Sequence, residues 1–590
     1  STNLAEEGST HVTHPDGTSF VSGDTHTLDP RIAACLSHAT RPNQSTKRRA
    51  LRDVVALIEG RASSYASSVT DVRESPTDEG FDHLACSPET VAAALPQWHR
   101  AFARLADDDH AETRLAAARA NAAFCAGAGR GLAAHLKRVA PAWFAAAHDE
   151  DAAVAAAASE SFARVFPTDE KRRAVLTRYA GEVLRRVEEK LAGESDATTS
   201  GSSEERRERS ERTRAASLRA LAGFARAADA RSDAVVDALT KTLEAIPGGL
   251  RACAASPSAK VRRAAYGAAL AVATADGAYG DRSVLGTREP ERRAELAAVA
   301  LLDATEERDG SSLGEARELT LGFLKCRGDD AWRDLSDLAK TLSATTNDAA
   351  DSDSRRGDER DRYDASIDAF LGTLERHVSS GCHGAAEASA PSVLPLLAAL
   401  PRGALFRDFS LKKGRLRRLL ASLWEGYALC NVPSRSADAA ALLRAFREAT
   451  LYGAIVVAEE GESESESERA ANAEAFRAEL FRDAFLERWI PEALTTLTSS
   501  VSASLITEIP EKTEGSSSRA LDAPLVTASL CECLVGVSRR PALAETCLRA
   551  TMERTAADCE RMVSGSSPGG RVDAPGARRV AAFHAALCDA

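Results

Sequence analysis

Residues 131–191 read GLAAHLKRVAPAWFAAAHDEDAAVAAAASESFARVFPTDEKRRAVLTRYAGEVLRRVEEKL, and this stretch decides the fold. From Val175 to Leu191 apolar side chains recur every three or four residues, with charged side chains between them. That period predicts one amphipathic helix with a single buried stripe. Pro167 ends the preceding helix, and Thr168 is placed to cap the next one. Because such helices cannot bury their stripes alone, we expect them to stack on neighbours as a helical solenoid.

The composition supports an all-α protein. The 590 residues are 44% hydrophobic and only 5% aromatic, and alanine is abundant, which favours closely packed helices. We predict no β-structure, because we recognise no Asn-Gly or Asp-Gly turn between alternating apolar runs. The expected fold class is therefore an all-α, HEAT/ARM-like helical-repeat solenoid with long disordered loops between repeats.

Charge and cysteine content limit the function classes. The formal net charge is -12, so a protein that coats nucleic acid over its whole surface is excluded, and RNA contact would come from local patches. The 12 cysteines are scattered, which indicates reduced core thiols in the cytosol. The sequence contains no apolar run of about 18 residues, so we predict no membrane span. The sequence starts without Met and ends on an apolar helix, so we expect a fragment that is truncated at both ends.

Composition shifts divide the chain into eight segments. Polar or highly charged stretches with no apolar stripe are predicted to be disordered, and amphipathic stretches are predicted to be repeats. We expect a disordered lead-in (1–26), HEAT-like repeats (27–192), a disordered charged insertion (193–214), repeats (215–342), a disordered insertion (343–362), repeats (363–458), an acidic low-complexity loop (459–474), and further helical repeats that are truncated (475–590).

Short motifs along the first two thirds of the chain resemble one family. They include Asp29-Pro30-Arg31, Leu95-Pro96-Gln97-Trp98, Asp107 to His110 with Thr113-Arg114, Pro141-Ala142-Trp143, Phe166-Pro167, Lys260-Val261-Arg262-Arg263, and Leu423-Trp424-Glu425-Gly426. In this order they resemble the N-terminal HEAT-repeat region of listerin, a ribosome-associated E3 ubiquitin ligase, over most of residues 29–427.

The resemblance implies a function for the whole protein. Listerin's N-terminal region docks on the 60S ribosomal subunit beside the quality-control factor that bears the nascent chain. A distant C-terminal RING then recruits an E2 ubiquitin-conjugating enzyme and ubiquitinates stalled nascent chains. We expect this chain to be a monomer in the cytosol, associated with ribosomes.

The sequence itself contains no catalytic signature. A RING needs paired Cys-x-x-Cys motifs around two zinc ions, and the nearest pair here is Cys531-Glu532-Cys533, with the wrong spacing. There is no phosphate loop and no nucleophile elbow. We predict no catalytic residue, no metal site and no cofactor in this chain, with zinc expected only in the missing RING, so the fragment itself is expected to be inactive. Trp98, Trp143, Trp424 and Trp489 are predicted to be core anchors.

Two basic clusters are candidates for ribosome contact. The first is Lys47, Arg48 and Arg49, and the second is Lys412, Lys413, Arg415, Arg417 and Arg418. The alternative for either cluster is a solvated helix face that acids of the next repeat partly neutralise. A second function also stays open, a non-enzymatic HEAT or armadillo scaffold or transport adaptor.

Overall fold

The protein is described here by a computed structural model. It describes residues 11–13, 19–21, 28–60, 86–192, 202–229, 231–278, 285, 289–344, 355–401, 404–405, 414–430, 433–459, 549 and 553. The chain divides into two compact units, Ser1–Glu289 and Pro290–Ala590.

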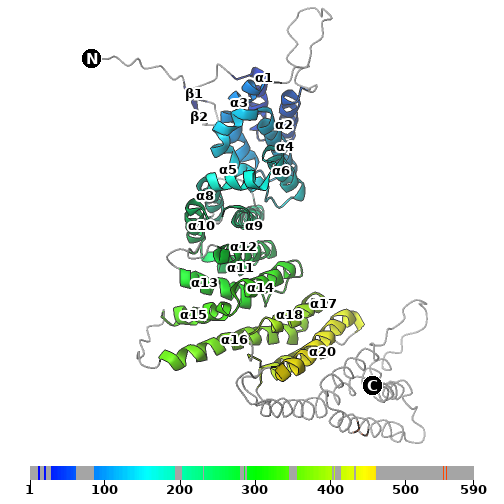
Figure 1. The fold of residues 1–590 in the computed structure, drawn as a ribbon. Helices are drawn as coiled ribbons and strands as arrows, with labels where there is room; N and C mark the ends of the chain where they lie inside the picture. The colour runs from blue at the N-terminus through cyan, green and yellow to red at the C-terminus, as the bar shows by residue number, and fades with distance from the viewer. Residues whose placement is uncertain are drawn as a thin grey trace, which may run out of the picture. The chain divides into compact units, whose positions relative to one another are not determined.

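The first unit is built almost entirely of helices (Figure 1). Its elements are β1 (His11–Thr13), β2 (Ser19–Val21), α1 (Pro30–Ala39), α2 (Gln44–Ile58), α3 (Pro88–Leu105), α4 (Ala111–Gly127), η1 (Gly129–His135), α5 (Leu136–Ala146), α6 (Ala152–Val165), α7 (Asp169–Arg178), α8 (Ala180–Leu191), α9 (Ser203–Ala227), α10 (Asp233–Ala245), α11 (Gly249–Ala254) and α12 (Ala259–Ala278).

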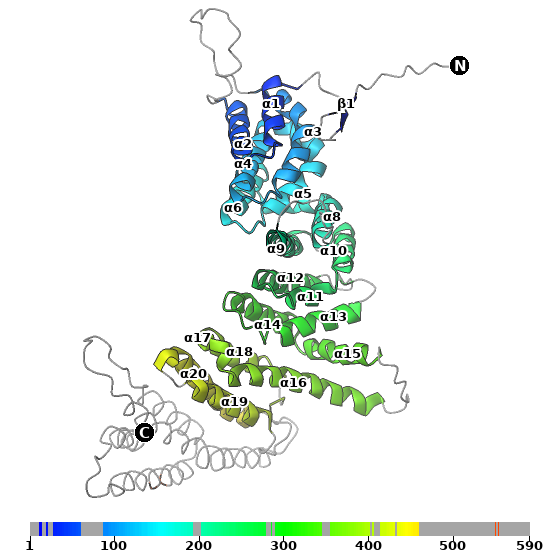
Figure 2. The same cartoon turned by 180° about the vertical axis from the view of Figure 1, so that it is seen from behind.

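The helices of the first unit form two layers, as Figures 1 and 2 show from opposite sides. Helices α2, α4 and α6 pack in sequence as one layer, and α1, α3 and α5 form the other. Helix α5 also contacts α8, which packs on both α9 and α10, and α9 packs along α12. This stacking of helix pairs confirms the predicted all-α, HEAT/ARM-like helical-repeat fold.

Capping residues explain where these helices begin. Ser87 accepts the Thr90 N–H at the start of α3, where Pro88 occupies the first turn. Thr168 accepts the Lys171 N–H at the start of α7, as predicted. The helix predicted from Val175 onward is in fact two, because Tyr179 leaves helical geometry with φ -115° and ψ 29° between α7 and α8.

Aromatic side chains fill the space between the layers. Trp98 is fully buried, stacks on Phe124 with ring centroids 4.5 Å apart, and donates its indole N–H to Asn121. Trp143 is buried as well and donates to the Ser161 hydroxyl at 2.8 Å. Trp424, in the second unit, is 2% exposed. The prediction of tryptophan core anchors is confirmed for these three, and Trp489 lies outside the described residues.

The second unit is likewise helical. It contains α13 (Glu289–Ala298), η3 (Val299–Asp303), α14 (Leu313–Arg327), α15 (Asp330–Ala344), α16 (Arg355–Ser379), η4 (Gly381–Gly384), α17 (Ala386–Ser389), η5 (Ala390–Ser392), α18 (Val393–Ala398), α19 (Arg415–Cys430), η6 (Pro433–Arg435) and α20 (Ser436–Glu459). Helix α19 packs between α16 and α20. A Cβ atom at Gly426 would lie 2.0 Å from the Val378 carbonyl oxygen, so only glycine permits this close approach of α19 to α16.

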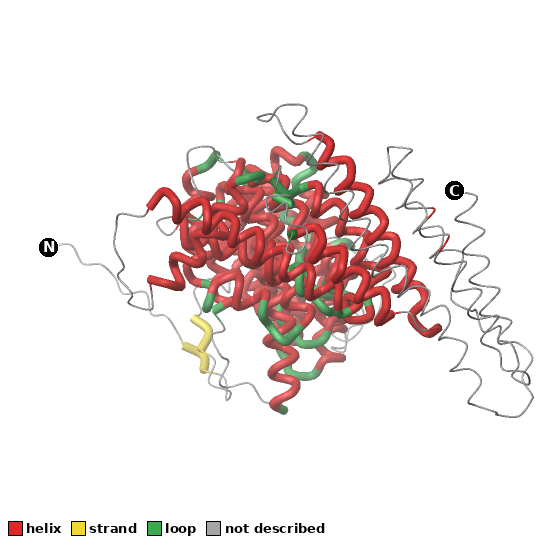
Figure 3. The backbone as a smooth tube through the Cα atoms, turned by 90° about the horizontal axis from the view of Figure 1, so that it is seen from below, coloured by secondary structure: helices red, strands yellow, loops and turns green. Residues whose placement is uncertain are grey.

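The structure corrects the prediction that no segment forms β-structure. Figure 3 shows two short strands beside an otherwise helical chain, and β1 pairs antiparallel with β2, with Val12 opposite Phe20. Both strands lie within the lead-in that we predicted to be disordered. The signal was present in the sequence, because Asp16-Gly17 stands between them.

The charged insertion predicted as disordered at 193–214 is also corrected in part. Helix α9 begins at Ser203, where Ser202 and Glu205 form a reciprocal capping box. Within the helix Arg207 pairs with Glu211 one turn away. Likewise, α15 extends to Ala344 and α16 begins at Arg355, so helices occupy both ends of the predicted 343–362 insertion. Residues 460–474 and, apart from Arg549 and Glu553, 475–590 lie outside the described residues.

Candidate functional site

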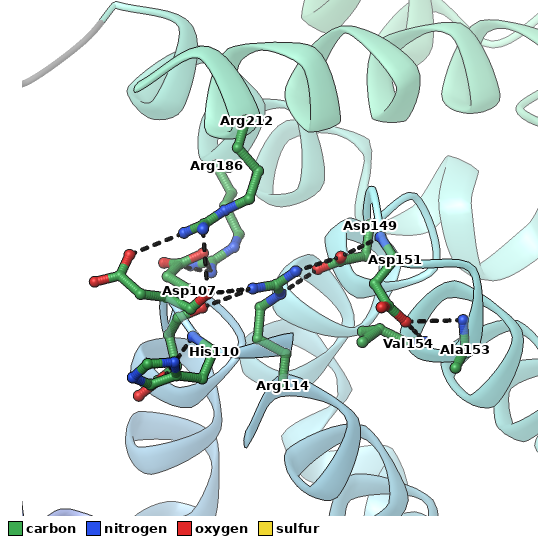
Figure 4. Close-up of polar contacts among 11 residues, drawn as sticks. Asp107, His110, Arg114, Asp149, Asp151, Ala153, Val154, Arg186 and Arg212 are labelled. Atoms are coloured by element: carbon green, nitrogen blue, oxygen red, sulfur yellow. Dashed lines mark hydrogen bonds and ion pairs between the residues drawn. The ribbon is translucent and has the colours of Figure 1, made fainter. Parts of the chain in front are cut away.

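An acidic turn follows α3 and connects three helices by ion pairs. We define it as Asp107, Asp108 and Asp109. Figure 4 shows two of the cations involved, Arg186 and Arg212. Asp107 lies 3.0 Å from the Arg186 guanidinium and 2.7 Å from the Lys190 ammonium, both on α8. Asp108 pairs with Lys47 of α2 at 2.6 Å. Asp109 pairs with Arg209 and with Arg212, the latter at 3.0 Å, which fixes the charged half of α9 to this turn.

Arg114 lies behind the acidic turn and is almost completely buried. Its Nε and Nη2 atoms donate to the two carboxylate oxygens of Asp149 at 2.8 and 2.9 Å. Its Nη1 atom donates to the carbonyl oxygens of Asp108 and Asp109. Arg114 can lie on the buried face of α4 because Asp149 satisfies its charge there.

The same network continues into the next repeat. Asp149 accepts the Asp151 N–H at 2.8 Å, and Asp151 caps α6 by accepting the N–H groups of Ala153 and Val154 (Figure 4). A cavity of about 60 Å³ lies beside the network and is lined by both cations and carboxylates, including Arg114, Asp149, Arg186 and Arg212. Since the charged side chains around it are paired with one another among the described residues, this network stabilises the repeats.

The first predicted basic cluster belongs to this network. Lys47 is 15% exposed and bonded to Asp108, which is 6% exposed. Arg48 pairs with Glu112 at the start of α4. Arg49 is the most exposed of the three, at 62%, and lies 3.8 Å from Asp53 on the same helix. The cluster therefore fits the alternative interpretation, a helix face that acids of the next repeat neutralise. Its contact with a ribosome stays a prediction.

The structure describes only three of the five residues of the second predicted cluster. Lys412 and Lys413 lie outside the described residues. Arg415 is buried and donates to both carboxylate oxygens of Asp368, at 2.9 and 2.8 Å. Arg418 bonds to Asp368 and Glu375, and Arg417 is half-buried at the start of α19. Hydrogen bonds from Arg415 and Arg418 hold the pKa of Asp368 below its ordinary value although burial opposes them.

A different group of basic side chains in the first unit forms no ion pair with any described carboxylate. We call it the α3–α5 patch and define it as His99 and Arg100 of α3, His135 at the end of η1, and Arg138 of α5. Helix α3 packs against both η1 and α5, which brings the four side chains to one surface. Arg100 and Arg138 are exposed, and the two histidines are half-buried.

In the α3–α5 patch, neighbouring basic side chains lower the pKa values of both histidines. Burial lowers the pKa of His99, and Arg138, Arg100 and His135 lower it further, while a hydrogen bond to the Leu95 carbonyl opposes them. Burial and then Arg138 lower the pKa of His135. Sequence reasoning missed this patch because its members come from three elements, and no local run of basic residues reveals it.

The described residues also bear on catalysis and metal binding. Among them, no three His, Cys, Asp or Glu side chains are grouped so that they could hold a metal ion. Burial raises the pKa values of the Cys35 and Cys382 thiols to about 12, as expected of inert core cysteines. None of the helices in the described part of the chain is both long enough and apolar enough to span a bilayer.

These features define a HEAT/ARM-like helical-repeat protein. Residues 28–282 match the family model described as E3 ubiquitin-protein ligase listerin, N-terminal domain. The match confirms the resemblance from its start to residue 282. The resemblance from there to about Tyr427 stays a prediction.

Comparison with other proteins adds little. No curated protein matches the chain. A structure of Kap95p with RanGDP is 11% identical, covers 95% of this chain and 70% of its own, and has a TM-score of 0.30. Importin beta is 10% identical over 95% of this chain and 69% of its own, with a TM-score of 0.27. A circular tandem repeat protein is 14% identical over 85% of this chain and 96% of its own, with a TM-score of 0.29. At these TM-scores the similarities support no functional argument.

Proposed function

We propose that this chain is the N-terminal part of a listerin-type E3 ubiquitin ligase and docks on the 60S ribosomal subunit during ribosome-associated quality control. The observation that carries the proposal is the family match over residues 28–282. In this function the partners are the 60S subunit and the factor that holds the stalled nascent chain, and the protein works in the cytosol.

The contribution of this chain to ubiquitin transfer is positional. The RING that recruits the E2 enzyme, with its zinc ions, is not encoded in these 590 residues, which contain no Cys-x-x-Cys pair. A stacked helical array that binds the ribosome holds a tethered RING near the substrate lysine and raises its effective concentration there. No residue of this chain takes part in a chemical step.

Cosedimentation tests the docking directly. The purified chain is centrifuged through sucrose with isolated 60S subunits, 40S subunits and 80S ribosomes over a series of salt concentrations. We expect selective pelleting with 60S subunits that weakens as salt rises, because phosphate contacts release counterions. Absence of binding to every particle at low salt, with the nascent-chain factor added, would contradict the proposal and leave a non-enzymatic scaffold or transport adaptor as the better reading.

A ubiquitination assay tests the division of labour. With ubiquitin, E1, a panel of E2 enzymes and stalled ribosome complexes, this chain is expected to form no ubiquitin chains. It is also expected to inhibit full-length listerin in the same reaction by occupying its site on the 60S subunit. Chain formation by these 590 residues alone would overturn the assignment of a purely positional role.

A further inference from the structure

The α3–α5 patch differs from the basic side chains of the acidic network, which are bonded within the fold. Lys47, Arg186 and Arg212 each pair with a carboxylate of the acidic turn, and Arg48 pairs with Glu112 of α4. Among the described residues, none of the four patch side chains forms an ion pair. Two exposed guanidiniums beside two histidines, with no ion-paired acid among the described residues, leave the patch able to take up an external anion.

The chemistry of the patch favours RNA over an acidic protein. Each exposed guanidinium, on Arg100 and Arg138, can donate two parallel hydrogen bonds to a phosphate. The His99 and His135 rings are only half-buried and offer flat faces on which an unstacked base can lie, as aromatic and guanidinium planes do in single-stranded RNA sites. An acidic peptide would use the charges of the patch but not its rings.

We propose that the α3–α5 patch binds the phosphodiester backbone and unstacked bases of RNA, and that it supplies the ribosomal RNA contact of the docked protein. This inference rests on the proposed function for the identity of the RNA. It also moves the expected contact away from the Lys47–Arg49 cluster, whose cations are bonded within the fold.

The test compares two variants with the same change in net charge. The first, R100E/R138E, reverses the two exposed arginines of the patch. The control, K171E/R173E, reverses two cations of α7 that are exposed and that form no ion pair among the described residues. Circular dichroism during heating establishes that both full chains fold. Binding is then measured by fluorescence anisotropy with a labelled single-stranded RNA of mixed sequence about 20 nucleotides long, and by cosedimentation with 60S subunits.

We expect R100E/R138E to weaken RNA binding at least tenfold and K171E/R173E to weaken it less than threefold. The slope of log K against log salt should fall by about 1.4 in R100E/R138E, since each single-strand phosphate contact contributes about 0.7. Pelleting with 60S subunits should fall in parallel. Equal losses in the two variants would show a general charge effect and overturn the inference.

The two readouts separate this inference from the proposed function. If the wild-type chain pellets with 60S subunits and R100E/R138E pellets equally well, the patch assignment is wrong and the docking proposal survives. If R100E/R138E loses 60S binding while its affinity for RNA is unchanged, the patch contacts an acidic ribosomal protein and the RNA assignment is wrong. If the wild-type chain binds RNA through the patch but no ribosomal particle, RNA binding stands and the docking proposal fails.

Discussion

The α3–α5 patch and the acidic turn that follows α3 hold their charged side chains in opposite situations. In the acidic turn, Asp107, Asp108 and Asp109 each bond to cations of a different helix. On the α3–α5 patch, Arg100 and Arg138 lie near His99 and form no ion pair with a described carboxylate. Paired charges between repeats specify how the helices stack, whereas unpaired charges at the surface remain available for a ligand.

This comparison predicts that variants of the two regions separate stability from binding. Changes in the acidic network should lower the free energy of unfolding and leave RNA affinity unchanged. Changes in the patch should weaken RNA binding and leave the free energy of unfolding unchanged. Variants of the acidic network should have the largest effects.

The largest effect is expected from Asp149→Ala. The substitution leaves the Arg114 guanidinium, 5% exposed, without its bidentate carboxylate. Loss of one partner of a buried ion pair costs about 3–5 kcal/mol. Urea unfolding followed by circular dichroism measures this change. The matched control is Asp169→Ala, which breaks the exposed pair with Arg172 and should cost less than about 1 kcal/mol. Equal effects of the two variants would show that the buried network has no special role.

Lys47→Ala is expected to give an intermediate loss. The Asp108 carboxylate keeps its bond from the His110 N–H but loses its ammonium partner, and an under-satisfied buried group costs about 1–3 kcal/mol. RNA affinity should stay within twofold of wild type, because the comparison assigns Lys47 to the network. A tenfold loss of RNA affinity at unchanged stability would return the first basic cluster to the binding surface.

The sequence predicted the helices well where local signals decide them. The capping residue Thr168 and the apolar period of α8 involve only near neighbours, so both could be read in advance. The start of α9 at Ser203 also has a local signal, the capping box of Ser202 and Glu205. The bonds of Arg209 and Arg212 to Asp109, about 100 residues earlier in the chain, could not be predicted from local signals.

The functional surfaces were harder to predict for the same reason. A run such as Lys47–Arg49 attracts attention as a binding site, but acids from another repeat neutralise most of its charge. The burial of Arg114 depends on Asp149, which belongs to the next helical pair. The α3–α5 patch could not be predicted because its members come together only when α3 packs on η1 and α5. Its lack of an ion pair with a described carboxylate is likewise visible only in the folded structure.

Acid should weaken the network through Asp108. Burial alone would raise the pKa of this carboxyl, but Lys47 and the His110 N–H outweigh burial and hold the pKa below its ordinary value. A lowered folded-state pKa contributes stability that is present above the unfolded-state value of about 4 and is lost as pH falls through the folded-state value. The difference in free energy of unfolding between wild type and Asp108→Asn should therefore shrink below about pH 4. A constant difference across this range would contradict the stabilising role of the charged pair.

The smallest expected effect concerns the histidines of the patch. Their pKa values are lowered by burial and by neighbouring cations, so the free protein favours the neutral rings. A bound phosphate favours the protonated ring, so RNA binding should take up protons, and affinity should rise as pH falls below about 6.5.

Each histidine should contribute about a two- to fivefold gain, the worth of a partly exposed ion pair. The charged groups that face them are Arg100 on α3 and Arg138 on α5. Anisotropy titrations of wild type and of the His99→Gln/His135→Gln variant measure it, and the variant should lose the dependence. If the variant keeps the same dependence, the RNA lies elsewhere, and the contrast between a fully paired turn and an available patch no longer explains binding.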